Sequence, residues 1–106
     1  MKPKNGMRPI HPGEILEEEF LKPLGLSSRK LADSLDVPPN RVSSIIAGER
    51  VVTADTALRL GRALGTTPQF WLNLQQTYDL RIAEETTDLR GVKRATRRQA
   101  LGRRHG

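Results

Sequence analysis

The fold is decided by the stretch SRKLADSLDVPPNRVSSIIAG, which covers residues 28–48. Its first part predicts a short helix over Ser28–Leu35, because Ser27 is a favourable N-cap residue. Its second part predicts a helix over Pro39–Ala47, with proline in the first turn and Gly48 at the place of a left-handed C-terminal cap. Only residues 36–38 separate the two helices, so the stretch is interpreted as a helix-turn-helix.

Two small or polar residues fit the interior of this motif. Ala32 lies midway along the first helix, where a close helix crossing requires a small side chain. Asp36 stands in the turn, where a left-handed residue and usually glycine is needed; aspartate adopts that conformation more readily than most residues. The side chains expected to wedge the pair against the core are apolar: Leu31, Leu35, Val37, Val42 and Ile45.

The second helix of the motif also carries a polar face. Hydrogen-bonding side chains alternate there with the apolar anchors, and they are Asn40, Arg41, Ser43 and Ser44. Such a face suits the major groove of DNA, where the base edges present donors and acceptors. The alternative interpretation is a plain helical hairpin inside a bundle, but that structure does not require an outward polar face.

Three more helices are predicted around the motif. The first covers about Pro12–Leu21 and is ended by Lys22-Pro23-Leu24-Gly25, because proline cannot continue a helix. His11 is expected to help start this helix. A fourth helix, capped by Thr53 and closed by Gly65, has apolar positions at Ala57, Leu58 and Leu64, and a fifth begins at Thr67-Pro68. No strand-like alternation of useful length occurs, so the expected fold is all-α: a compact five-helix domain with a basic C-terminal tail.

Length and charge set the organisation of the chain. The 106 residues suit one domain, which we divide into an arm (1–10), a DNA-binding domain (11–88) and a tail (89–106). The net charge of +6 indicates a polyanionic partner. However, residues 1–89 hold 11 basic and 12 acidic side chains, and residues 90–106 hold seven basic and none acidic. The folded part must therefore attract DNA with a local patch. The tail is either an arm that contacts the DNA backbone or a solubilising end.

Three motifs in this order carry a family resemblance: HPGEIL (11–16), LA (31–32) with VSSIIAG (42–48), and TPQFWLNL (67–74). About residues 7–85 resemble the HigA-type antitoxins of the XRE, or phage-repressor-like, helix-turn-helix family. The resemblance implies a homodimer that binds a palindromic operator in double-stranded DNA and represses its own operon. It also implies a partner, a small RNase toxin that cleaves mRNA and is neutralised by the antitoxin.

The resemblance assigns roles by position. Asn40 can pair with adenine, Arg41 with guanine or a phosphate, and Pro39 can offer only an apolar contact. The expected base-contacting residues are Pro39, Asn40, Arg41, Ser43 and Ser44. Phosphates are expected at Ser28 and Arg29, where a helix begins and backbone amides point outward, and at Arg50 after the recognition helix.

The fifth helix carries an aromatic stripe, which is expected either in the core or in a dimer interface. We predict a homodimer built partly from Phe70, Trp71, Leu74 and Tyr78. The acidic run Glu17–Glu19 is expected to be a solvated helix face, with docking of a basic toxin as the second interpretation.

Several classes of function are disfavoured by the sequence. No acid, base and nucleophile occur together, so an enzyme is not expected. No cofactor or metal is expected either, because cysteine is absent and neither His11 nor His105 has a second ligand at metal spacing. No apolar run is long enough to span a membrane, and the expected location is the cytoplasm, with nucleoid association through the operator. A stand-alone XRE-type repressor without a toxin remains the alternative function.

Overall fold

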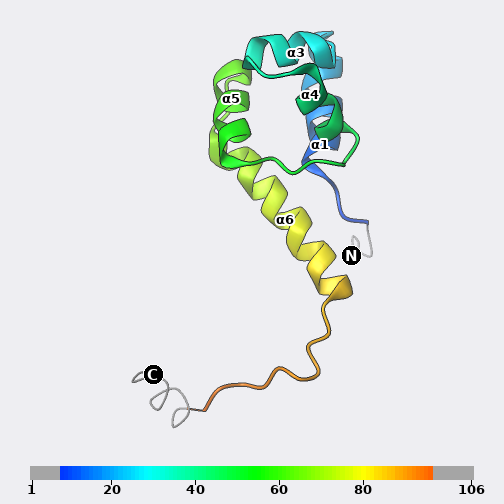
Figure 1. Ribbon diagram of the computed structural model, residues 1–106, viewed down its shortest axis with the longest axis vertical. Helices are drawn as coiled ribbons and strands as arrows, with labels where there is room; N and C mark the ends of the chain where they lie inside the picture. The colour runs from blue at the N-terminus through cyan, green and yellow to red at the C-terminus, as the bar shows by residue number, and fades with distance from the viewer. Residues whose placement is uncertain (1–7, 97–106) are drawn as a thin grey trace.

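The computed structural model describes residues 8–96, and within them it is entirely helical. The first three elements join end to end into one rod, so residues 8–96 form five helices, as predicted (Figure 1). The elements are α1 (Pro12–Ile15), the π-helix η1 (Leu16–Leu21), α2 (Lys22–Leu24), α3 (Ser28–Leu35), α4 (Pro39–Ile46), α5 (Ala54–Leu64) and α6 (Pro68–Thr86).

Local capping signals define most of these helices. The hydroxyls of Ser27, Thr53 and Thr67 each accept a hydrogen bond from a backbone amide in the first turn of α3, α5 and α6, respectively. After α4 and α5, Gly48 and Gly65 adopt a left-handed conformation, both with φ of 77°. The predicted positions of these helices are therefore confirmed to within a residue or two.

The predicted end of the first helix is wrong. The rod continues through Pro23 to Leu24 and stops at Gly25, which is left-handed with φ of 62°. In an α-helix the proline ring would collide with the carbonyl four residues earlier. Here the preceding turn is π-helical, with the Lys22 amide donating to the carbonyl of Glu17, and this wider turn relieves the collision.

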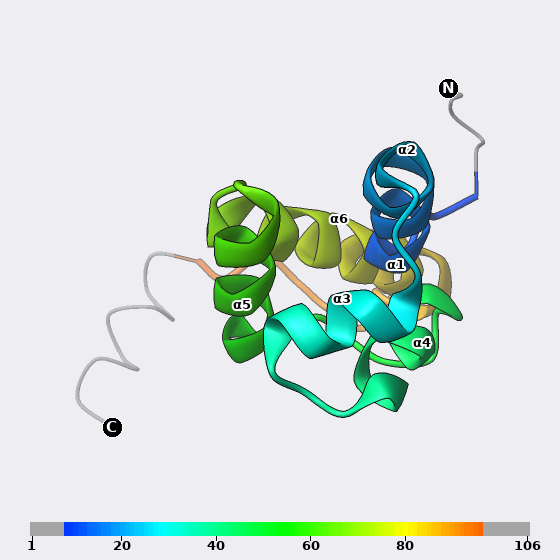
Figure 2. The ribbon, with the colours of Figure 1, turned by 90° about the horizontal axis from the view of Figure 1, so that it is seen from above.

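A single core lies between the rod, the α3–α4 pair, α5 and the first half of α6 (Figure 2). Its fully buried apolar side chains are Leu16, Leu31, Ala32, Val42, Ala57, Leu60 and Trp71. The expectation that Leu58 faces this core is wrong, since Leu58 is 62% exposed and Leu60 takes the buried position. Trp71 fills the centre, and its indole Nε1 donates to Thr66 Oγ1 at 2.7 Å.

The ends of the chain differ from this packed centre. The second half of α6 projects away from the other helices, and residues 87–96 lead off from it without a further helix (Figure 1). The outer parts of the predicted arm and tail, residues 1–7 and 97–106, lie outside the described residues, as does His105. Among the helices of residues 8–96, none combines the length and apolar character that a membrane span requires.

Candidate nucleic-acid interface

The turn between α3 and α4 has the geometry expected of a helix-turn-helix. Asp36 is left-handed, with φ of 58°, as predicted, and it is the one non-glycine residue with positive φ within residues 8–96. Ala32 has no exposed surface, so the two helices cross closely at that point. The structure adds a residue that sequence reasoning missed: Arg59 of α5 donates from Nη1 to the carbonyls of Leu35 (2.8 Å) and Asp36 (3.3 Å). A charged donor thus satisfies the carbonyls at the end of α3.

The opposite end of α4 is fixed by the rod. Val42 and Ile45 lie on the inner face of α4 and are buried. Gly13 of α1 lies so close to α4 that a Cβ atom there would be 1.8 Å from the carbonyl oxygen of Ile45. This close backbone approach requires glycine. The orientation of α4 is therefore set by its contacts with α3 and with α1.

The outer face of α4 presents the residues that were predicted to read bases. Pro39, Asn40 and Ser43 are exposed, and Arg41 and Ser44 are half-buried. The Ser44 hydroxyl donates to the carbonyl of Asn40 at 2.5 Å and accepts from Nε of Arg50 at 2.8 Å. Arg50, predicted separately as a phosphate contact, is therefore held directly beside α4. The structure brings Ser44 and Arg50 together as one unit.

Arg41 is less free than the sequence suggested. Its guanidinium lies 3.7 Å from the carboxylate of Asp55, which also accepts from Nε of Arg59 at 3.0 Å. Arg41 and Arg50 flank a hollow of about 320 Å³ at the start of α5, lined also by Thr53 and Asp55. Asp55 is an acidic residue in the first turn of α5, and its contact with Arg41 depends on how the start of α5 is placed relative to α4.

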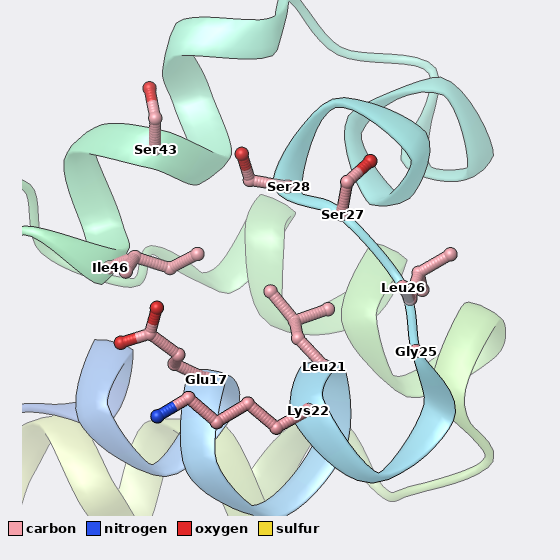
Figure 3. Close-up of a pocket in the computed structure, with 9 residues that line it drawn as sticks. All are labelled: Glu17, Leu21, Lys22, Gly25, Leu26, Ser27, Ser28, Ser43 and Ile46. Atoms are coloured by element: carbon pink, nitrogen blue, oxygen red, sulfur yellow. The ribbon is translucent and has the colours of Figure 1, made fainter.

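The predicted phosphate contacts Ser28 and Arg29 occupy the first turn of α3. Arg29 is exposed, and Ser28 is half-buried at the edge of a groove of about 490 Å³ between the rod and the α3–α4 pair. Figure 3 shows Ser28 and Ser43 on the α3–α4 side of this groove and Glu17 on the rod opposite them. Ser27 Oγ accepts from the Lys30 amide, which leaves the amides of Ser28 and Arg29 at the open end of the helix.

The acidic run of the rod is only partly a solvated face. Glu18 and Glu19 are exposed, and Glu18 accepts from Nζ of Lys22 at 2.7 Å. Glu17 is half-buried and lines the groove described above. Its carboxylate therefore lies next to the predicted DNA-contacting residues, where it contributes negative charge.

The predicted dimer residues separate into two groups. Trp71 has no exposed surface, so the expectation that it forms an interface is corrected: it belongs to the core. Phe70 is 37% exposed and meets the ring of Phe20 on the rod, with the centroids 6.2 Å apart. Leu74 and Tyr78 are half-buried. The predicted dimer residues did not include the other apolar residues of α6 and the tail that are at least a third exposed: Leu80, Ile82, Leu89 and Val92.

His11 begins the first helix, as expected. Its Nδ1 accepts a hydrogen bond from the Gly13 amide at 2.9 Å. Within the part of the chain that the structure describes, no group of three or more histidine, cysteine, aspartate or glutamate side chains is placed to hold a metal ion.

Comparison with known proteins places this geometry among regulators. The model of the helix-turn-helix family matches residues 18–71. Virulence-associated protein I of Dichelobacter nodosus is 56% identical over 82 residues, which are 77% of this chain and 76% of that protein. Antitoxin HigA-1 of Vibrio cholerae is 48% identical over 77 residues, which are 73% of this chain and 72% of that protein. The solved structure of antitoxin GraA in complex with its operator superposes with a TM-score of 0.80 at 50% identity, covering 87% of this chain and 96% of the GraA chain.

Proposed function

The chain belongs to the XRE-type helix-turn-helix family and, within it, to the HigA-type antitoxins, and from this membership we propose that it binds operator DNA with α4 in the major groove. The resemblance seen in the three sequence motifs is thereby confirmed. One observation carries the proposal for this chain: Arg50 is held against Ser44, next to the exposed Asn40 and Ser43. This cluster offers donors and acceptors on the one face of α4 that the core leaves open.

Each residue near α4 then has a role in the complex. Asn40 and Ser43 read base edges, and Pro39 makes an apolar contact. Arg50 binds at the edge of the groove, where its guanidinium reaches a base or a phosphate. Arg41 reads a guanine or binds a phosphate while Asp55 holds it from behind.

The backbone of the DNA is bound on the other side of the motif. The first turn of α3, with Ser28 and Arg29, binds a neighbouring phosphate through its amides and the arginine side chain. The tail beyond residue 89, with seven basic and no acidic side chains from residue 90 onward, adds phosphate contacts.

The operator is palindromic and the protein is a homodimer in this proposal. A two-fold dimer presents two copies of α4 about 34 Å apart, one turn of DNA. The exposed apolar residues of α6, Phe70, Leu80 and Ile82, support self-association, because exposed apolar side chains can be buried against a second copy. Binding in the promoter represses transcription by occlusion, and no catalytic step is involved. A separate surface neutralises a small mRNA-cleaving toxin.

The test is footprinting of the purified protein on the DNA upstream of its own gene. We expect a symmetric protected site. Asn40→Ala should weaken specific binding by about 1–3 kcal/mol and relax the preference at one base pair. Gln76→Ala, an exposed residue of α6 on another surface, serves as the matched control. An equal fall in specific and non-specific affinity would contradict base reading by Asn40.

A stand-alone repressor is the second candidate, because the DNA-binding residues are the same with or without a toxin. Co-expression with the neighbouring reading frame separates the two. The antitoxin proposal expects a stable complex and relief of growth inhibition. Absence of both, with operator binding intact, leaves the stand-alone repressor.

A further inference from the structure

The loop between α4 and α5 is hydrogen-bonded on both sides of Arg50. On the α4 side, the Glu49 amide donates to the carbonyl of Ser44 at 2.9 Å. On the α5 side, the Val52 amide donates to Oε1 of Gln75, a residue of α6, at 2.7 Å. The backbone of Arg50 lies between these two bonded amides, so their positions determine where its side chain begins.

The amide group of Gln75 has a single orientation. The residue is 6% exposed, and its Nε2 donates to Oδ1 of Asp79 at 3.0 Å. A carboxylate only accepts hydrogen bonds and a backbone N–H only donates, so a flipped amide would lose the bonds to Asp79 and to Val52 together. A buried amide that is bonded at both ends fixes the backbone that it meets.

The side chain of Arg50 depends on this loop backbone. Arg50 is exposed, and its Nε reaches Ser44 Oγ on α4 at 2.8 Å. A long exposed side chain loses rotamer freedom when it is held in one geometry. One hydrogen bond at the surface offsets that loss only if the backbone already places the guanidinium within reach.

We infer that Gln75 is a positioning residue for operator binding: its amide oxygen holds the Val52 amide and thereby sets Arg50 against Ser44, ready for the DNA. The inference rests on the proposed function and deepens it, because it assigns a role in operator binding to a buried side chain of α6, outside the α3–α4 unit. Without this bond the loop samples other positions, and the complex must order it on binding, which lowers affinity.

The experiment is a double-mutant cycle on the full chain, with fluorescence anisotropy measuring affinity for the DNA fragment upstream of its own gene. Gln75→Met keeps an unbranched side chain but removes the strong acceptor, and Arg50→Ala removes the side chain that is positioned. Gln75→Met should lower operator affinity about three- to tenfold in the wild-type background and less than about twofold in the Arg50→Ala background. Gln76→Met, the same substitution at the adjacent exposed glutamine, should leave affinity unchanged.

Amide hydrogen exchange of the free protein provides a readout without DNA. In Gln75→Met the Val52 amide should exchange at least about tenfold faster relative to the Leu60 amide, which lies inside α5 and reports the fold as a whole. The side chain of Val52 is only 3% exposed and stays in the core, so the change should remain local to the loop. An unchanged ratio of the two exchange rates overturns the inference.

The affinities separate positioning from a general loss of stability. An equal loss in both Arg50 backgrounds overturns the inference, because Gln75 would then act on the fold as a whole, and so does wild-type affinity in Gln75→Met. If Gln75→Met does not fold, the exposed Asp79→Ala replaces it, since it releases Nε2 of the amide and the cycle cancels the effect of the lost charge. Its expected loss is at least about twofold and absent in the Arg50→Ala background, and the same two outcomes overturn the inference.

A failure of the function beneath the inference has its own signature. If the wild type does not bind the DNA fragment, the proposed function is overturned and the role of Gln75 in operator binding with it. If the wild type binds but the exchange ratio or the cycle gives the contrary result, only the inference fails.

Discussion

In the α3–α4 unit each helical turn buries an apolar side chain in the core, whereas residues 77–86 of α6 bury none. Both segments show helical apolar spacing in the sequence: Ile82 continues the stripe that begins at Trp71 and passes Tyr78. Yet Trp71 is fully buried and Ile82 is 36% exposed, because α6 runs beyond the elements that would cover it. Periodicity thus identifies the face of a helix, and only the neighbouring elements determine whether that face is buried.

The largest contrast is expected within α6 itself. Trp71→Ala should lower the free energy of unfolding by about 3–5 kcal/mol, since it leaves a cavity in the core and removes the partner of the Thr66 hydroxyl. Leu80→Ala, on the projecting half, should change the free energy of unfolding of the monomer by less than about 0.5 kcal/mol. Urea denaturation followed by circular dichroism gives both values. Similar losses for the two variants would mean that the second half of α6 is packed in the free chain.

The next largest effect is expected where α1 packs against α4 at Gly13. Gly13→Ala should cost about 2–3 kcal/mol, because the new methyl group meets the backbone of Ile45 and α4 must shift. Gly91→Ala is the matched control, as a Cβ there has no atom within 4 Å. Thermal unfolding and operator affinity measured on both variants check this. A Gly13→Ala protein with wild-type stability would contradict the close approach of α1 to α4.

The open stripe of α6 predicts self-association. If it is covered by a second copy, Ile82→Asp should raise the dissociation constant of the dimer at least about tenfold, the cost of losing one buried aliphatic side chain. Leu58→Asp places the same charge on an exposed leucine of α5 and should leave the dimer intact. Sedimentation equilibrium measures both constants. A wild-type protein that is monomeric at tens of micromolar would remove the dimer from the proposal.

The smallest expected effect concerns the turn of the α3–α4 unit. Asp36→Gly should stabilise the protein by about 0.5 kcal/mol, because glycine adopts the left-handed conformation without a steric cost. This gain is the net of a larger steric relief and the extra conformational entropy that glycine loses on folding. Asp33→Gly, inside α3, should instead destabilise it by about 0.3–0.5 kcal/mol. Opposite signs in the two melting-temperature shifts are the expected outcome. The same sign for both would show that the turn stores no strain.

Features that depend on neighbouring residues in the chain were predictable. The structure shows the helix caps and the left-handed residues that short stretches of sequence predict. They are the caps at Ser27, Thr53 and Thr67 and the left-handed Asp36 and Gly48. The polar face of α4 was predictable for the same reason, since it follows from helical spacing alone.

Features that depend on how distant elements meet were not predictable. Leu58 and Leu60 are equally apolar. Gly61 lets α5 lie close to Thr66 and Pro68, and in this position of α5 Leu60 is buried and Leu58 is exposed. The roles of Arg59 and Gln75 needed the packing of α5 and α6, because each bonds a residue 23 or 24 positions away. Pro23 in a helix required the π turn before it, which no propensity indicates.

The bond between Ser44 and Arg50 has a consequence for how such a protein diverges. Asn40 stands exposed in the first turn of α4, so a lineage can exchange it in one mutational step and acquire a new base preference. Residues 44 and 50 are different, because a change at either one disturbs the geometry of the other. If Asn40 reads a base as proposed, its operator position should drift quickly among descendants, whereas positions contacted by Ser44 and Arg50 should change only when two substitutions are fixed together.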